Sequence, residues 1–237
     1  MEQIVFSTYG ASPALTYARK YLESWGYPIS PDPGDATHLL LPVPSFDDNG
    51  NIKGGGDLPQ LRQGATVFGG NLPMLQNPKV DFLQDPFYLE ENAAITARCA
   101  MKYAPIQPGV PVLLIGWGRI GKHLAALLQQ AGADVTVAVR KASHLQRLTE
   151  LGFQAVYLQD MKPRQYDVVF NTAPASVLFA GECKEDAVLI DLASVSGIFG
   201  KGVIWARGLP GKDAPEESGA LIAKTALRYA LGKELQV

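Results

Sequence analysis

A glycine-rich hexapeptide carries the clearest chemical signal in the sequence. It consists of Gly116, Trp117, Gly118, Arg119, Ile120 and Gly121, and it stands between an apolar run at 112–115 and an apolar-periodic segment at 120–131. In a strand-turn-helix of this kind the first glycine permits the tight turn and the second admits a pyrophosphate. The third lets the helix pack close to the sheet. Phosphates then bind N–H groups at the positive end of the helix dipole. The hexapeptide therefore predicts a dinucleotide site, and the alternative is a glycine-rich turn that binds no ligand.

The residues after the next strand indicate which dinucleotide is bound. An NAD site usually has Asp or Glu about 20 residues beyond the glycines, where it holds the ribose 2′-hydroxyl. Here the apolar run 135–139 is followed by Arg140, Lys141 and Ser143, with no acid among them. A guanidinium binds a 2′-phosphate through two parallel hydrogen bonds, whereas a carboxylate repels it. We therefore predict NADP rather than NAD, and the alternative is an ordinary solvated basic loop.

Polar residues also follow two later strands. Asn171, Thr172, Ala173 and Pro174 come directly after the run 168–170, and Asp191 follows the run 188–190. Ligands of open α/β sheets bind beyond the carboxyl ends of the strands. We expect all five residues to contact the cofactor, with Asn171 and Asp191 orienting cofactor or substrate during catalysis. The alternative is that these side chains cap helices and form turns.

The histidines and cysteines limit the chemistry further. The chain has three histidines, and none of them is placed to act as an acid or base at the nicotinamide. No group of His, Cys and carboxylate residues has metal-ligand spacing, so we predict no metal. Two cysteines without a CxxC pair favour a reducing compartment.

Composition excludes several classes of protein. The chain has 237 residues, 47% hydrophobic and 19% charged, which is enough to bury a sizeable core. A formal charge of −2 without a basic stripe argues against nucleic-acid binding. We find no signal peptide and no apolar run approaching 18 residues. We therefore expect a cytoplasmic protein that does not bind membranes.

The order of the elements predicts an α/β protein. From Val112 onward, strands and helices alternate as in a doubly wound parallel (Rossmann) sheet, which we place in an NADP-binding domain over 92–211. The preceding strand, helix, strand, loop and strand predict a smaller α/β domain over 1–91 on the substrate side. The remainder, 212–237, contains a helix at 217–231 that is expected to pack back on the first domain. The cleft between the domains would hold the substrate.

Several separate motifs resemble one known family. They are Asn171-Thr172-Ala173-Pro174, then Leu189-Ile190-Asp191-Leu192-Ala193-Ser194, then Gly208-Leu209-Pro210-Gly211-Lys212-Asp213-Ala214-Pro215. In this order they resemble the family of the dipicolinate synthase A subunit, and the glycine hexapeptide and the residues Arg140 to Leu145 fit the same family. The likeness extends over 112–231, roughly half of the chain.

Before Val112 the likeness is weaker, and the N-terminal part is shorter than in a typical member. Leu40-Leu41-Pro42-Val43 is similar to a strand end of the family. The segment Asn92 to Ala100 is similar to the family's NAxPTAEGA, but Ile95, Arg98 and Cys99 stand in place of its proline, glutamate and glycine. The change at Arg98 reverses a charge, which puts the family's usual reaction in doubt if that glutamate serves the substrate.

The resemblance implies an NAD(P)-dependent oxidoreductase of spore-forming bacteria that makes dipicolinate during sporulation. The substrate would be a cyclic lysine-pathway dicarboxylate, 4-hydroxy-tetrahydrodipicolinate or dihydrodipicolinate. Loss of water and transfer of a hydride to NADP would give the aromatic product. The flavoprotein-like B subunit of the same enzyme is the implied partner, and we also expect a homo-oligomer.

A dicarboxylate needs cationic partners, and Lys212 is the first candidate, as a substrate-binding and catalytic residue. Arg98 is the second, and the resemblance adds Pro42 and Val43 to the substrate side. Lys212 is alternatively a solvated turn lysine. Two other functions stay open: a non-catalytic nucleotide-binding member of such a complex, or an NADP oxidoreductase for another small carboxylate.

Overall fold

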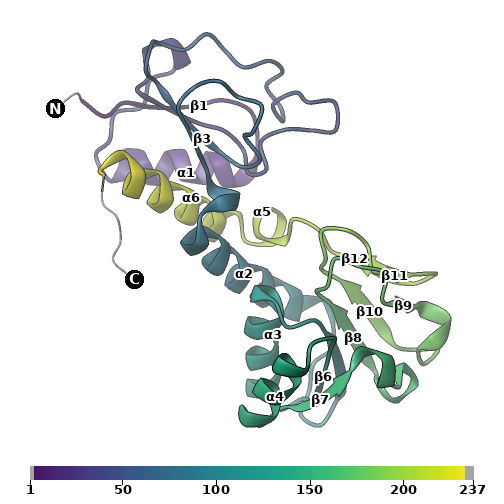
Figure 1. Ribbon diagram of the computed structural model, residues 1–237. Helices are drawn as coiled ribbons and strands as arrows, with labels where there is room; N and C mark the ends of the chain where they lie inside the picture. Colours follow the sequence, from purple (N-terminus) through teal and green to yellow (C-terminus); the bar gives the residue numbers. More distant parts are fainter. Residues whose placement is uncertain (1–2, 233–237) are drawn as a thin grey trace. The chain divides into compact units, whose positions relative to one another are not determined.

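The computed structural model describes residues 3–232, which form two compact units. One unit contains the residues up to Asn92 together with those from Pro210 onward, and the other runs from Ala93 to Leu209. Each unit has its own parallel sheet and its own helices (Figure 1).

The first unit contains a four-stranded parallel sheet in which neighbouring strands follow one another in the sequence. Its strands are β1 (Phe6–Thr8), β2 (His38–Leu40), β3 (Thr66–Gly69) and β4 (Lys79–Asp81). The predicted small parallel α/β fold is confirmed, with β4 as a strand that the sequence did not indicate. Aromatic rings pack across the sheet: His38 stacks on Phe68 at 5.5 Å and contacts Phe6 at 5.3 Å between ring centroids. His38 therefore has a packing role.

Two helices distant in sequence pack together in this unit. They are α1 (Pro13–Ser24) and α6 (Pro215–Ala230), which lie side by side in Figure 1. Their close approach depends on Gly219, where an added Cβ would lie 2.5 Å from Cβ of Tyr17 and 2.8 Å from N of Ala18. The C-terminal helix thus completes the unit that the first residues of the chain begin.

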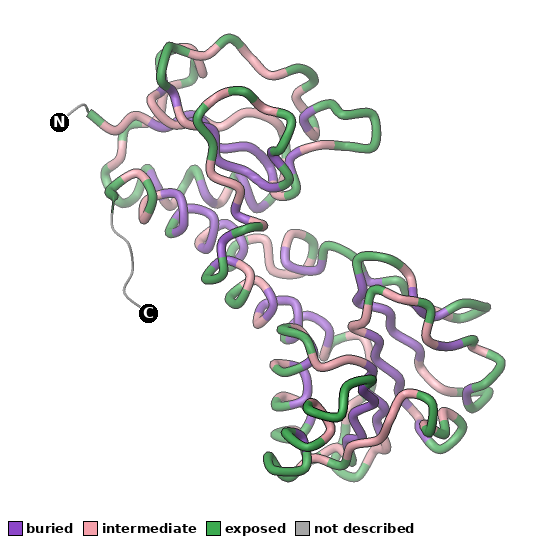
Figure 2. The backbone as a smooth tube through the Cα atoms, in the orientation of Figure 1, coloured by how far each residue is buried: buried purple, intermediate pink, exposed green. Residues whose placement is uncertain are grey.

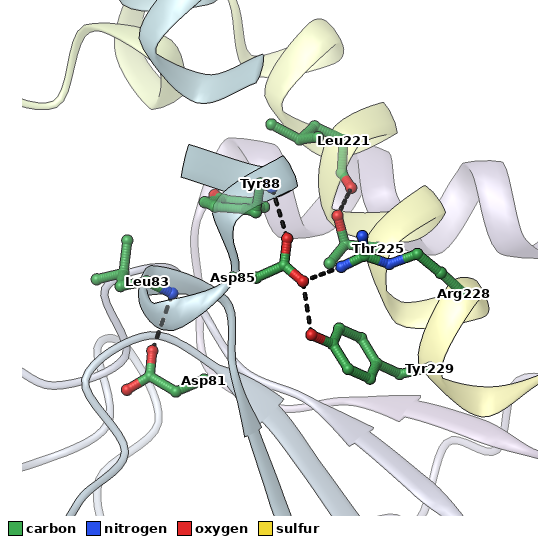
Figure 3. Close-up of polar contacts among 8 residues, drawn as sticks. All are labelled: Asp81, Leu83, Asp85, Tyr88, Leu221, Thr225, Arg228 and Tyr229. Atoms are coloured by element: carbon green, nitrogen blue, oxygen red, sulfur yellow. Dashed lines mark hydrogen bonds and ion pairs between the residues drawn. The ribbon is translucent and has the colours of Figure 1, made fainter. Parts of the chain in front are cut away.

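A buried carboxylate ties α6 to the start of α2 (Pro86–Ala100) within the same unit (Figure 3). Asp85 accepts a hydrogen bond from the Tyr88 amide at 2.7 Å, one from the Tyr229 hydroxyl at 2.5 Å, and an ion pair from Arg228. Asp85 caps the helix and proline stands at its first position, so α2 begins at Pro86.

The second unit contains a six-stranded parallel sheet in the order β12-β10-β8-β5-β6-β7. Its strands are β5 (Pro111–Ile115), β6 (Asp134–Val139), β7 (Gln154–Tyr157), β8 (Val168–Asn171), β10 (Val188–Asp191) and β12 (Val203–Trp205). Within this sheet β5 comes first in the sequence, and β6 and β7 follow on one side of it. The chain then crosses to the other side of β5, where it forms β8, β10 and β12. This is the strand order of the doubly wound dinucleotide-binding fold, so the predicted fold class is confirmed. The switch point lies between β5 and β8.

The two halves of this sheet have different connections. Helices α3 (Arg119–Gln130) and α4 (Ala142–Glu150) join β5, β6 and β7. Between β8 and β12 the described chain instead contains short turns and a two-stranded parallel sheet of β9 (Leu178–Phe179) and β11 (Ile198–Phe199). After β12 comes α5 (Leu209–Asp213), where the sequence predicted a turn.

The core of the second unit lies on its central strands, drawn purple in Figure 2. Val112 to Ile115 on β5 are at most 1% exposed, and the strands on either side are almost as well covered. Continuous burial of this kind is expected for a parallel sheet with both faces covered. The carboxyl edge of this rigid sheet positions the candidate site.

Candidate dinucleotide site

A pocket of about 220 Å³ lies at the carboxyl ends of β5, β6 and β8. Its lining consists of Ile115, Gly116, Trp117, Gly118, Ala138, Val139, Arg140, Lys141, His144, Leu158, Thr172, Ala173, Pro174 and Val177. Three segments that the sequence marked separately, after three different strands, therefore meet at one place. The position is the switch point at which ligands of such sheets bind.

The glycines of the hexapeptide have distinct surroundings. Gly116 has φ +103°, and an added Cβ would lie 2.5 Å from Oγ1 of Thr172, which itself donates to the Ile115 carbonyl at 3.0 Å. A Cβ on Gly121 would lie 2.5 Å from the Gly116 carbonyl oxygen. Around Gly118, by contrast, nothing stands within 4 Å of the Cβ position. Gly116 and Gly121 are thus needed for packing, whereas Gly118 leaves open space.

The open space lies at the start of α3. Gly118 is the N-cap of this helix and has no side chain to cap it. Helix N-termini of this kind attract phosphate because N–H groups and the helix dipole both favour an anion. The residues therefore fit the pyrophosphate of a dinucleotide. Arg119 and Ile120 stand in the first turn of this helix, outside the pocket lining.

The pocket lining includes two cationic side chains and one histidine. Arg140 and Lys141 are exposed between β6 and α4, and His144 lies half-buried in the first turn of α4. The lining residues include no aspartate or glutamate. Ser143 is exposed in the same turn but does not line the pocket. This edge of the pocket suits an anion such as a ribose phosphate.

The predicted site residues did not include six residues of the pocket lining: Ile115, Ala138, Val139, His144, Leu158 and Val177. Leu158 comes directly after β7, so the strand-end rule that marked Asn171 would also have found it. Val177 precedes β9, a strand too short to give a sequence signal. The apolar part of the pocket has the character that a flat adenine ring requires.

Asn171 and Asp191 lie beneath the site and not in the lining. Both are 0% exposed, and the Asn171 amide donates to Asp191 Oδ1 at 2.9 Å. The Asp191 carboxylate also accepts from the backbone N–H groups of Ala193 at 3.0 Å, Gly197 at 2.6 Å and Ile198 at 2.9 Å. These bonds engage both carboxylate oxygens. We call Asn171, Asp191 and the backbone groups that they bind the carboxylate hub.

The carboxylate hub also supports one wall of the pocket. Asn171 closes a short turn by bonding both the N–H and the carbonyl of Ala173, at 2.9 and 3.1 Å. The Gly197 carbonyl accepts from the Val177 N–H at 2.9 Å. A Cβ on Gly197 would lie 2.3 Å from the Ala175 carbonyl oxygen, so this packing needs glycine. The contacts describe Asn171 and Asp191 as positioning groups, and a catalytic role for either stays a prediction.

The four predicted substrate residues belong to different units. Pro42 is buried and Val43 half-buried after β2, and the Ser45 hydroxyl, which donates to the Pro42 carbonyl at 2.8 Å, holds this turn. Lys212 is exposed on α5, also in the first unit. Arg98 is exposed on the part of α2 that belongs to the second unit. A role in substrate binding stays a prediction for all four.

Residues 3–232 include no helix that is long and apolar enough to cross a membrane. Over the same range no three His, Cys, Asp or Glu side chains form a group that could hold a metal ion. Burial, together with the neighbouring Glu182, raises the pKa of the Cys183 thiol. A thiol held in its neutral form is a poor nucleophile.

Comparison with known proteins gives a consistent result. The family model of ketopantoate reductase PanE/ApbA matches residues 112–189. The A subunit of dipicolinate synthase from Bacillus subtilis (strain 168) is 30% identical over 128 residues, which are 48% of this chain and 43% of that protein. The sequence match thus spans less than half of the length of that relative.

Solved structures match over much more of the chain. The crystal structure of the dipicolinate synthase A subunit from Bacillus halodurans has a TM-score of 0.82, with 21% identity, and covers 96% of this chain and 97% of that one. The corresponding structure from Bacillus subtilis gives a TM-score of 0.80, with 19% identity, and covers 98% of this chain and 97% of that one. At 21% and 19% identity, these two structures show that the chain has the same fold.

A solved structure of a protein with a different name is also similar. A transhydrogenase from Sinorhizobium meliloti matches with a TM-score of 0.69 at 16% identity, covering 96% of this chain and 93% of that one. The similar proteins are thus named as a reductase, a transhydrogenase and part of a synthase. The name of the matching family model, ketopantoate reductase, supports the prediction of an oxidoreductase with an NAD(P)-binding fold.

Proposed function

We propose that the chain is an NADP-dependent oxidoreductase that acts, like the A subunit of dipicolinate synthase, on a small cyclic dicarboxylate. The observation that carries the cofactor choice is the pocket edge at the end of β6. Arg140 and Lys141 line it, and no acidic residue is among the lining residues. A carboxylate at this place would select the 2′-hydroxyl of NAD, whereas two cations favour a 2′-phosphate.

Different residues of the pocket bind different parts of the dinucleotide in this proposal. Gly118 leaves room for the pyrophosphate at the start of α3, and the opposite wall consists of Thr172, Ala173, Pro174 and Val177. The carboxylate hub fixes that wall before any ligand arrives, so little ordering is needed on binding. A bound nicotinamide cofactor accepts a hydride, and the protein's part is to position the substrate carbon against it.

The proposed substrate is a dicarboxylate of the dipicolinate type. The name of the relatives supports it, together with motifs shared from Asn171 to Pro215. Lys212 and Arg98 are exposed cations that we propose as carboxylate partners, and Pro42 and Val43 stay on the proposed substrate side. We also propose a cytoplasmic location. The family resemblance supports the flavoprotein-like B subunit as the proposed partner.

The test is turnover of dihydrodipicolinate and of 4-hydroxy-tetrahydrodipicolinate with NADP, with and without the B subunit, followed by NADPH absorbance. Formation of NADPH together with dipicolinate is the expected result. Turnover of monocarboxylates but not of these dicarboxylates would replace the substrate proposal with that of another small carboxylate. NADPH formation from neither class would contradict the enzymatic proposal.

A second candidate function is that of a non-catalytic protein that binds the nucleotide within such a complex. The segment Asn92 to Ala100 favours it, because the family's glutamate is replaced by Arg98, which is exposed on α2. The variant Arg98→Glu separates the two: faster formation of dipicolinate indicates a modified enzyme, and no change indicates the partner role. The matched control is Lys102→Glu, which reverses a charge just beyond the same helix, in 101–103.

A further inference from the structure

The segments that directly follow β8, β10 and β12 contain a single charged residue. These segments are 172–177, 192–197 and 206–208, and the charged residue is Arg207. In the doubly wound fold the half of the sheet with the glycine turn binds the adenosine part of a dinucleotide. The half beyond the switch point receives the nicotinamide. Arg207 is therefore the cation that the sequence provides at the nicotinamide half of this edge.

The last residue of β12, Trp205, lies in register with residues of the candidate site. It pairs with Asp191 of β10, which pairs with Asn171 of β8, and Asn171 in turn pairs with Ile115 of β5. Three strand spacings of about 4.8 Å each separate Trp205 from Ile115, which lines the dinucleotide pocket. Trp205 and the turn after it thus stand at the same carboxyl edge as the pocket, within the second unit (Figure 1).

Contacts with the loop after β10 hold the Trp205 ring in place. Its indole Nε1 donates to the Ala193 carbonyl at 3.1 Å, and the Ala193 N–H donates to the Asp191 carboxylate at 3.0 Å. The ring is therefore connected to the carboxylate hub through one residue. It nevertheless stays 47% exposed. A large apolar side chain thus has a fixed position at the surface, where another group can pack on it.

The Arg207 guanidinium packs on this ring, with its Cζ atom 4.9 Å from the centroid of the Trp205 ring. The side chain is exposed, and over residues 3–232 its guanidinium forms no ion pair or hydrogen bond. No Asp or Glu occurs from 192 to 212, so the neighbouring sequence supplies no carboxylate to it. A cation–π contact restricts the long side chain while its N–H donors stay available. The guanidinium is thereby positioned for an anion before the anion binds.

We propose that Arg207 binds one carboxylate group of the substrate and that Trp205 is the positioning residue that holds the guanidinium for it. A planar guanidinium matches a carboxylate through two parallel hydrogen bonds, which also fix the orientation of the molecule that carries the carboxylate. The inference rests on the proposed function, because it places the substrate at the nicotinamide half of the edge.

The carboxyl edge of the sheet then has two cationic positions with different ligands. Arg140 and Lys141, after β6, bind the 2′-phosphate of the cofactor, and Arg207, after β12, binds the substrate. Lys212 and Arg98 stay the candidates for the second carboxylate of a dicarboxylate. The two positions can be tested separately, because each acts on a different ligand.

The test is calorimetric titration of the NADP-bound protein with pyridine-2,6-dicarboxylate and with pyridine-2-carboxylate. Neither aromatic compound can give a hydride to NADP, so binding is measured without turnover. Arg207→Gln is expected to weaken binding of the dicarboxylate at least tenfold, with the affinity for NADP and the melting temperature unchanged. The matched control is Arg164→Gln, since Arg164 is an exposed arginine ahead of β8, at the opposite edge of the sheet, and should bind like the wild type.

A double-mutant cycle tests the role of Trp205. Trp205→Ser should weaken the dicarboxylate roughly threefold or more, and Trp205→Phe, which keeps a ring under the guanidinium, should recover most of the affinity. In the Arg207→Gln background Trp205→Ser should cause no further loss, because its effect acts through the guanidinium. Equal further loss in that background would contradict the positioning role.

The results separate this inference from the proposed function. If Arg207→Gln binds the dicarboxylate as tightly as the wild type does, the inference is overturned and the proposed function stands. If the wild type binds only pyridine-2-carboxylate and Arg207→Gln loses it, the inference stands and the proposed substrate changes to a monocarboxylate. If the wild type binds NADP but neither compound, the substrate proposal fails and the inference fails with it.

Discussion

At the scale of single residues, the site depends on which glycines are fixed by packing and which leave space. Gly121 lies against the Gly116 carbonyl, whereas the Cβ position of Gly118 is empty. The glycine hexapeptide therefore contains glycines of two kinds: one kind is needed for packing of the fold, and the other leaves space for the ligand. The distinction can be measured, because only the first kind affects the free protein.

Gly118→Ala is expected to leave the melting temperature nearly unchanged, since the methyl group meets nothing within 4 Å, and to weaken dinucleotide binding at least tenfold. Gly121→Ala is expected to lower the melting temperature as well, because its methyl group would lie 2.5 Å from a carbonyl oxygen. Thermal unfolding and calorimetric titration of both variants give the comparison. Equal loss of stability in the two would contradict this assignment.

Arg140→Asp tests the choice of cofactor. A hydrogen bond to a charged group contributes about 1.5–3 kcal/mol, so NADP affinity should fall roughly ten- to hundredfold while NAD affinity changes little. Arg147→Asp is the control, because this arginine lies on the helix that follows Arg140, α4, outside the pocket lining, and pairs with Glu150 at 3.2 Å. A similar loss for both cofactors would mean that Arg140 does not bind a 2′-phosphate.

Tyr88 should govern part of the stability at alkaline pH. The residue is 2% exposed, and burial raises the pKa of its hydroxyl far above the ordinary value. Above about pH 10 the unfolded chain loses the phenolic proton and the folded chain keeps it, so stability falls by up to about 1.4 kcal/mol per pH unit. Tyr88→Phe should flatten this decline between pH 10 and 12, measured by urea unfolding. An unchanged slope in Tyr88→Phe would show that the hydroxyl titrates in the folded protein.

At the scale of elements, helix starts and strand ends determine the architecture. Asp85 caps α2 and at the same time holds Arg228 and Tyr229 of α6, as Figure 3 shows. One buried carboxylate thus joins two helices that are far apart in the sequence. Its side chain is 3% exposed, so removing it leaves the Arg228 guanidinium, itself 15% exposed, without its partner.

Asp85→Ala is therefore expected to destabilise the first unit by about 3 kcal/mol. Asp32→Ala removes another capping carboxylate, exposed and bonded only to the Gly34 amide at 2.8 Å, and should cost about 1 kcal/mol or less. Denaturant unfolding of both variants measures the difference. Equal effects would show that the contact with α6 adds nothing to the cap.

Helices and strands with a clear period of hydrophobic residues could be predicted from the sequence, and very short helices and strands could not. The helix expected at 120–131 is α3, Arg119–Gln130, and the run 135–139 lies within β6. The two-residue strands β9 and β11 are too short to show alternation, and Pro210 and Gly211 conceal the five-residue α5. The start of α2 did have a signal in the sequence, an aspartate directly before a proline at 85–86.

At the scale of the whole molecule, the sequence indicated the second unit far better than the first. The switch-point pocket joins segments that follow β5, β6 and β8, and each was marked by a motif of its own. The roles of Asn171 and Asp191 were not predictable in the same way. Their partners, the backbone groups of Gly197 and Ile198, are brought close only by the path of the loop after β10.

The central claim is that the pocket binds a dinucleotide and prefers the 2′-phosphate form. Calorimetric titration of the purified chain with NADP, NADPH, NAD and NADH tests it most directly. We predict that both phosphorylated forms bind at least tenfold more tightly than their counterparts, because Arg140 and Lys141 line the pocket without an acidic residue. Absence of binding by all four, or a preference for NAD, would contradict the account.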